Sequence, residues 1–141
     1  MNGKALTPRE KRVRRHNVST LVAFLSFAVW ITAFTAFEAE FGAVRGFTSM
    51  LFLAALLVMF TTRNADEYTA AIWRAGTSLA FVVTVGFMFF APFIEGFLDG
   101  LFEGFTEQPT ERDLDTGELL PLVALASFFI ANAWTRIRGT F

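Results

Sequence analysis

The sequence predicts an all-α integral membrane protein, a bundle of four transmembrane helices with an amphipathic extension after the third helix. Hydrophobic residues make up 54% of the 141 positions and charged residues only 18%, whereas a soluble domain carries about 25% charged residues. The apolar residues gather in four runs, and basic residues flank these runs on alternate sides. Phe occupies 19 positions, and its ring can face lipid without burying a polar group.

The chain is expected to divide into a basic N-terminal segment, residues 1–17, and a four-helix membrane domain, residues 18–137. Pro8 and Glu10 are suited to open a short helix at the membrane surface. The first span is expected at about residues 18–37, because about 20 residues cross a hydrocarbon core of about 30 Å. This run is longer than the apolar region of a typical signal peptide, so we expect it to be retained.

The second span is expected at about residues 43–62. Arg45 would lie near its outer end, where a long basic side chain can reach the headgroup layer. Glu38 and Glu40 lie in the turn before this span, so either carboxylate could pair with Arg45.

The third span is expected at about residues 70–91. Asn64 and Glu67 in the preceding turn fit a capping box, and Asp66 also favours a helix N-terminus. Pro92 follows the apolar run, where it would either kink the helix or end it.

An amphipathic segment of unusual pattern follows at residues 93–105. Acids and glycines each recur every fourth residue, so each class would lie on one face of a helix. The segment could extend the third helix or lie on the membrane surface. An acidic outer loop, residues 106–118, leads to the fourth span at about residues 119–135, with Pro121 in its first turn.

The three acids of this segment, Glu95, Asp99 and Glu103, are candidates for cation binding, because hard cations prefer several oxygen ligands. The alternative is that they form only the solvated face of an interfacial helix. Whether any metal ion binds is left open by the sequence.

Several other side chains are candidates for helix packing or for lining a path through the membrane. The glycines could form a close-packing seam or only add flexibility. Asn132 lies inside the fourth span, where an amide is expected to form an interhelical hydrogen bond. Arg74 is a charge near the end of a span, where it can extend to the interface. The full set is Asn132, Arg74, Gly96, Gly100 and Gly104.

The distribution of basic residues predicts the orientation. All of them except Arg45 and Arg112 fall on the side that holds both termini. Short basic segments stay in the cytoplasm, so both termini are expected there, in a multi-pass protein of the cell inner (plasma) membrane. The acidic residues between Glu95 and Glu118 would then face outward.

The composition argues against several function classes. The chain has no Cys, and its single His16 and its lysines lie outside the predicted spans. Haem-type and retinal-type groups are usually held by such side chains within a bundle, so we expect no cofactor. No nucleophile or phosphate-binding motif is present, and we expect no enzyme activity. The basic N-terminal segment lies next to a span, so we expect a topology signal that also attracts anionic lipid, and no binding of nucleic acid.

The leading functional hypothesis is a non-catalytic accessory or interaction subunit of a membrane complex. Its partners would be the lipid bilayer and other membrane helices, either in a homo-oligomer or in a larger complex. The alternative is a small homo-oligomeric transporter or channel for cations, with the acids of residues 93–105 at its mouth.

The predicted orientation can be tested with reporters fused to each end of the chain. Both reporters should give the cytoplasmic signal, because ten or so basic charges are costly to translocate. Opposite signals from the two ends would contradict an even number of spans.

Overall fold

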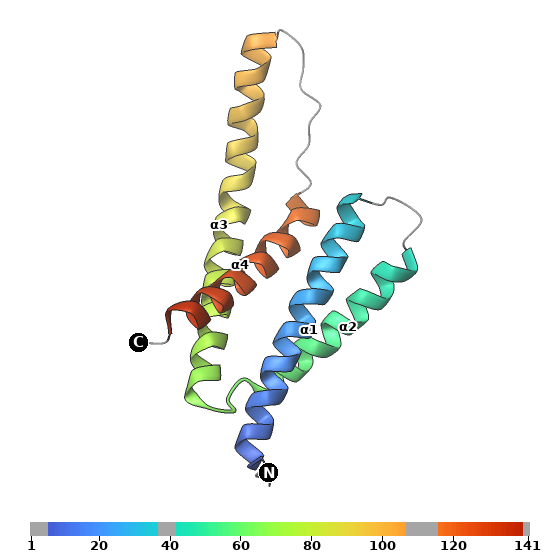
Figure 1. Cartoon of the computed structure of the whole chain (residues 1–141). Helices are drawn as coiled ribbons and strands as arrows, with labels where there is room; N and C mark the ends of the chain where they lie inside the picture. Colours follow the sequence, from blue (N-terminus) through green and yellow to red (C-terminus); the bar gives the residue numbers. More distant parts are fainter. Residues whose placement is uncertain (1–5, 37–41, 107–115, 140–141) are drawn as a thin grey trace. The chain divides into compact units, whose positions relative to one another are not determined.

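The computed structural model describes residues 6–36, 42–106 and 116–139, and in these ranges all regular structure is α-helical. Four helices are present there: α1 (Pro8–Ala36), α2 (Gly42–Thr62), α3 (Glu67–Thr106) and α4 (Thr116–Arg138) (Figure 1). Each of them is long and apolar enough to cross a membrane. The chain divides into two compact units, Met1–Ala71 and Ile72–Phe141.

Helix α1 begins earlier than the first predicted span and includes most of the basic segment. Thr7 caps it: the Thr7 backbone N–H donates to Glu10 Oε2 (2.7 Å), and the Glu10 N–H donates to Thr7 Oγ1 (3.3 Å). This reciprocal pair satisfies N–H groups that have no partner inside the helix, and Pro8 fits the first helical position because it has no N–H. The polar segment therefore continues directly into the apolar run as one helix.

In the first unit, α1 and α2 lie side by side (Figure 1). The faces that they bury are built from small side chains and hydroxyls. Small residues let two helices approach closely, which is the usual packing of helices in lipid. Phe27 of α1 contacts Phe52 of α2, with ring centroids 5.9 Å apart. The buried residues are His16, Ser19, Ala23, Ser26, Phe27 and Ala33 of α1 and Thr48, Ala55, Met59 and Thr62 of α2.

Arg45, near the start of α2, forms hydrogen bonds to the last turn of α1. Its guanidinium donates from Nε (3.1 Å) and Nη2 (2.8 Å) to the carbonyl oxygen of Ala33, in the last turn of α1. Carbonyls in a last turn have no partner within the helix, and a basic side chain also suits that negative end of the helix dipole. The expected partners Glu38 and Glu40 lie outside the described residues.

The predicted capping box at the start of α3 is wrong in its residues. The cap is Asp66, not Asn64: the Thr69 N–H donates to Asp66 Oδ1 (2.7 Å), and the Asp66 N–H donates to Thr69 Oγ1 (3.1 Å). Thr69 replaces Glu67 in the reciprocal role, because the helix begins at Glu67 and the third helical residue is Thr69.

Residues 93–105 extend α3, which settles the alternative that the sequence left open. Helix α3 has 40 residues and continues through Pro92, so its length is about 60 Å. Helix α4 begins at Thr116, which places Pro121 in its second turn and not in the first. It ends at Arg138, before Gly139 in the left-handed conformation (φ 77°), a usual C-terminal cap.

The Asp66 cap is expected to stabilise the start of α3 by about 1 kcal/mol, so Asp66→Ala should lower the free energy of unfolding by that amount at pH 7. The backbone hydrogen bond from Thr69 lowers the pKa of Asp66. A carboxyl whose pKa is lowered on folding stabilises the fold above its unfolded pKa of about 3.9, and this stabilisation is lost as the pH falls through the folded value.

Unfolding in detergent micelles, followed by circular dichroism, can measure the difference between the native chain and Asp66→Ala. That difference should shrink as the pH is lowered from 7 to about 3. Asp66→Asn is the matched control, since Asn also caps helices but carries no charge. A difference that stays constant over this pH range would contradict a role for the ionised carboxylate.

Candidate functional site

The three acids Glu95, Asp99 and Glu103 form a row along α3, the longest of the four helices, and are called here the acid row. Glu95 and Asp99 are half-buried and Glu103 is exposed. One helix carries all three, at a spacing that places them one turn apart. Among the described residues, no three His, Asp or Glu side chains come close enough together to hold a metal ion. The row is thus a charged face, and its affinity for cations stays a prediction.

The glycine row lies on a neighbouring face of the same helix. Gly96, Gly100 and Gly104 are exposed, and a Cβ added at any of them would meet nothing within 4 Å. No described part of the chain packs against them. A seam against another chain stays a prediction.

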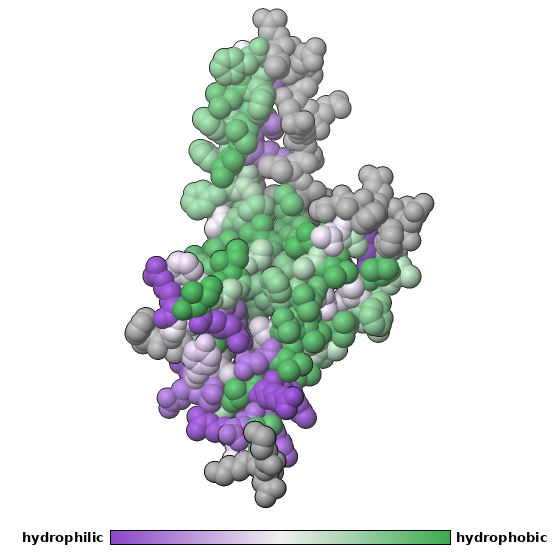
Figure 2. Space-filling view, in the orientation of Figure 1, coloured by the Kyte–Doolittle hydropathy of each residue, from purple (hydrophilic) through white to green (hydrophobic). Residues whose placement is uncertain are grey.

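Apolar side chains cover the rest of this part of α3, and they are exposed to an unusual degree. Phe93 is 73% exposed and Phe105 is 85% exposed, and no residue from Pro92 to Phe105 is fully buried. The space-filling view shows hydrophobic residues along this end of the helix, next to hydrophilic ones (Figure 2). A contiguous exposed apolar surface marks contact with lipid or with another protein. The exposed large residues are Phe93, Ile94, Phe97, Leu98, Leu101, Phe102 and Phe105.

Asn132 lies where α4 packs against α3, and it is only 2% exposed. Its Nδ2 donates to the Phe128 carbonyl of its own helix (3.0 Å), so the expected interhelical hydrogen bond is not the one it forms. Its Oδ1 is buried and accepts no hydrogen bond from the residues that the structure describes. Asn132 thus lies buried at a helix crossing, and a role in lining a path stays a prediction. Arg74, the other polar candidate of the spans, is exposed.

Gly76 of α3 makes this crossing close, and sequence analysis did not single it out. A Cβ at Gly76 would overlap the Asn132 amide and come within 2.8 Å of two carbons of the Phe128 ring. One turn earlier, Trp73 meets the same ring edge-on, with centroids 5.3 Å apart. The missed signal was a glycine within the apolar run, which often marks a close approach of two backbones.

His16, which sequence analysis set aside as part of a basic segment, is fully buried. Its Nδ1 lies 3.1 Å from Thr62 Oγ1, and the Thr62 hydroxyl donates to the Val58 carbonyl (2.6 Å). A hydroxyl has one proton, so Thr62 accepts from His16 and the Nδ1 atom carries a hydrogen. This bond joins α1 to the last turn of α2.

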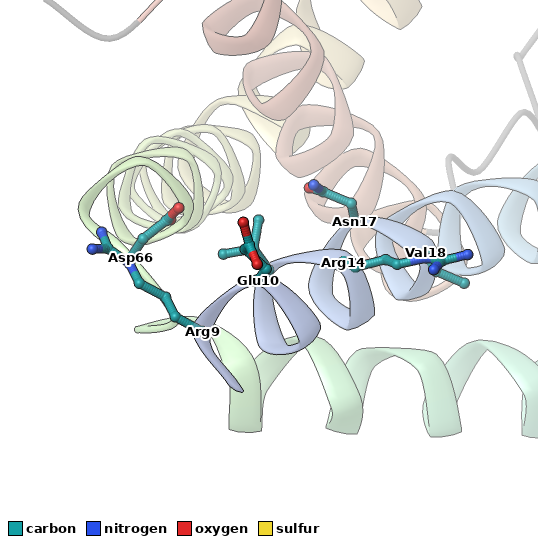
Figure 3. A pocket seen from close by; sticks show the side chains of 7 residues that line it. Arg9, Glu10, Arg14, Asn17, Val18 and Asp66 are labelled. Atoms are coloured by element: carbon teal, nitrogen blue, oxygen red, sulfur yellow. The ribbon is translucent and has the colours of Figure 1, made fainter. Parts of the chain in front are cut away.

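A pocket of about 420 Å³ lies beside the first turns of α1 (Figure 3). Its lining combines charges of both signs with an amide and two apolar side chains. Asp66 keeps its charge there, because the hydrogen bond from Thr69 lowers its pKa and the Arg9 charge acts in the same direction. The lining residues are Arg9, Glu10, Val13, Arg14, Asn17, Val18 and Asp66.

Comparison of the chain with protein-family models, with curated proteins and with solved structures finds no match.

The packing at Gly76 predicts that Gly76→Ala lowers the free energy of unfolding by about 1–3 kcal/mol, the usual cost of adding a methyl group to a filled contact. Gly86→Ala is the matched control on the same helix, since a Cβ there meets nothing within 4 Å. The control should be neutral or slightly stabilising, because Ala favours helix over Gly.

Unfolding of the two variants in mixed micelles, followed by circular dichroism, measures this difference. Equal stabilities for Gly76→Ala and Gly86→Ala would contradict the close crossing of α3 and α4.

Proposed function

We propose that this chain is a non-catalytic interaction protein of a membrane, acting as an accessory subunit. It would bind another membrane protein through the second half of α3, residues 87–106, called here the far half of α3. The observation that carries the proposal is the length of α3 together with its exposed apolar surface. Its 40 residues span about 60 Å, twice the thickness of a hydrocarbon core of about 30 Å.

A helix of this length cannot bury all of its apolar residues in one crossing. Tilting can absorb only part of the excess, because helices tilt by about 20° on average. The apolar residues of α3 that exceed one crossing include Phe93, Phe97 and Phe105, which are largely exposed in the described chain. Removing apolar surface from water contributes about 25 cal/mol per Å², so such a surface favours a binding partner.

The acids on this half of α3 suit the same role. Glu95, Asp99 and Glu103 would give one edge of the contact a negative charge. Charges at the rim of an interface select partners and set orientation more than they add affinity. We therefore propose a partner that offers an apolar groove with basic residues beside it.

In the proposed setting, the chain crosses the inner (plasma) membrane four times, with both ends in the cytoplasm. Arg63, Arg136 and Arg138 support this orientation: they lie at the ends of α2 and α4, and four successive crossings would bring these ends to the side of the N-terminus. The far half of α3 then lies on the outer side.

Photo-crosslinking in native membranes tests the proposed contact. A photoreactive phenylalanine at Phe97, which is 61% exposed, should form a discrete protein adduct. The matched control is the same group at Phe47 of α2, which is 69% exposed and should react mainly with lipid. The adduct mass separates a second copy of this 15.7 kDa chain from a different partner.

Adducts with lipid alone at both positions would contradict the proposal. A protein adduct of equal yield at Phe47 would show that contact is general and not localised on α3.

Cation transport by a homo-oligomer is the second candidate, and the acid row is the observation that favours it. Two or more copies would be needed, because four helices are too few to enclose a path. Cation flux into liposomes should then fall at least severalfold when Glu95, Asp99 and Glu103 are replaced by Gln. Flux that survives the triple replacement would reject a role for these acids.

A further inference from the structure

We propose that the pocket beside the first turns of α1 binds a group that joins a phosphate to a primary ammonium, which is the chemistry of a zwitterionic phospholipid headgroup. The site is separate from the surface of α3. Its lining comes from α1 and from Asp66, all within the first compact unit.

The balance of charge in the pocket selects this class of ligand. Arg9 and Arg14 bring two positive charges, and Glu10 and Asp66 bring two negative charges. A simple anion would meet both carboxylates, and a simple cation would meet both guanidinium groups. A ligand with one charge of each sign can satisfy a guanidinium and a carboxylate together, since guanidinium groups favour phosphate and carboxylates accept from ammonium.

Two of these charges, Glu10 and Arg14, are ordered along α1 in the way that matches the charges of a lipid headgroup. Figure 3 shows the Arg14 side chain extending along α1 toward Val18, where the apolar run begins. Glu10 lies four residues nearer the N-terminus, or about 6 Å along the helix. In a phospholipid the phosphate adjoins the glycerol and acyl chains, and the ammonium lies farther toward water. Arg14 is placed for the phosphate and Glu10 for the ammonium.

The carboxylates are held in place before any ligand arrives. Glu10 Oε2 accepts from the Thr7 backbone N–H (2.7 Å) and from Thr7 Oγ1 (2.8 Å). Asp66 Oδ1 accepts from the Thr69 N–H (2.7 Å). A carboxylate has about four acceptor positions, so each keeps capacity for an ammonium donor. A site whose groups are already ordered loses less entropy on binding.

The apolar part of the lining fits a lipid as the source of this group. Val13 and Val18 lie on the same stretch of α1 as the charges. They offer contact to the glycerol and the first methylene groups of an acyl chain. Asn17 adds an amide to the lining, and Figure 3 shows its side chain extending from α1.

The test is lipid binding to the full chain in detergent, with phosphatidylethanolamine as the probe and native mass spectrometry as the readout. Arg14→Gln and Glu10→Gln should each weaken binding by about threefold to fivefold, the value of an exposed charge pair. Glu10→Gln keeps the helix cap, because Gln also serves at that position.

The matched control is Arg12→Gln, which removes an exposed charge of the same helix that does not line the pocket. Its binding should stay within twofold of the native chain. An equal loss in Arg12→Gln and Arg14→Gln would overturn the proposal in favour of diffuse attraction. So would phosphatidylglycerol binding that matches phosphatidylethanolamine in the native chain and strengthens in Glu10→Gln, because the pocket would then recognise an anion alone.

Competition with soluble compounds distinguishes the two sources of the group. Displacement of the lipid by millimolar phosphoethanolamine would show that the headgroup alone suffices. Absence of displacement, with the losses in Arg14→Gln and Glu10→Gln retained, would assign the site to the intact lipid. Equal displacement by inorganic phosphate would overturn the proposal, because the ammonium group would then contribute nothing.

Discussion

Satisfying the backbone hydrogen bonds at helix ends is the constraint on which the rest of this structure depends. An apolar environment offers no water to an unpaired N–H or C=O group, so each such group must find a partner in the protein. Inside the helices the backbone supplies these partners. At the ends, side chains supply several of them. Thr7 with Glu10 begins α1, Arg45 reaches the last turn of α1, and Asp66 with Thr69 begins α3.

These end contacts also position the polar features of the molecule. The Thr7 and Thr69 bonds hold the carboxylates of Glu10 and Asp66 beside the pocket. The bond between His16 and Thr62 fixes the last turn of α2 against α1 at the same end. The negative charges of this pocket are therefore a consequence of how α1 and α3 are capped. Because capping already holds these charges in place, little further conformational entropy is lost when a ligand binds to them.

The contact between α1 and α2 and the contact between α3 and α4 both depend on small residues that let the helices approach closely. Helices α1 and α2 approach through Ala, Ser and Thr side chains, whose hydroxyls donate to their own helix, as Ser19 does to Arg15. Helices α3 and α4 approach each other closely at Gly76, which leaves room for Phe128 and Asn132. Dispersion contact at close range drives both, because lipid is as apolar as the side chains it would replace. On the far half of α3, by contrast, Phe93, Phe97 and Phe105 are largely exposed, which is why they define a surface for interaction.

The four apolar helices follow from the sequence alone, because a run of about 20 apolar residues is sufficient to specify a spanning helix. Their ends do not follow from it, since α1 begins at Pro8 and α3 continues to Thr106. The sequence also determined the face of acids and the face of glycines at residues 93–105, since these follow from helical periodicity alone. Tertiary structure decided which polar atoms pair. Asp66 rather than Asn64 caps α3, Asn132 bonds to its own helix, and His16 is buried against Thr62. These outcomes depend on the register between helices and on the residue at which each helix begins, and neither is specified by composition or local spacing. The closeness at Gly76 was decided in the same way, because a glycine permits a tight crossing but only the neighbouring helix can use it.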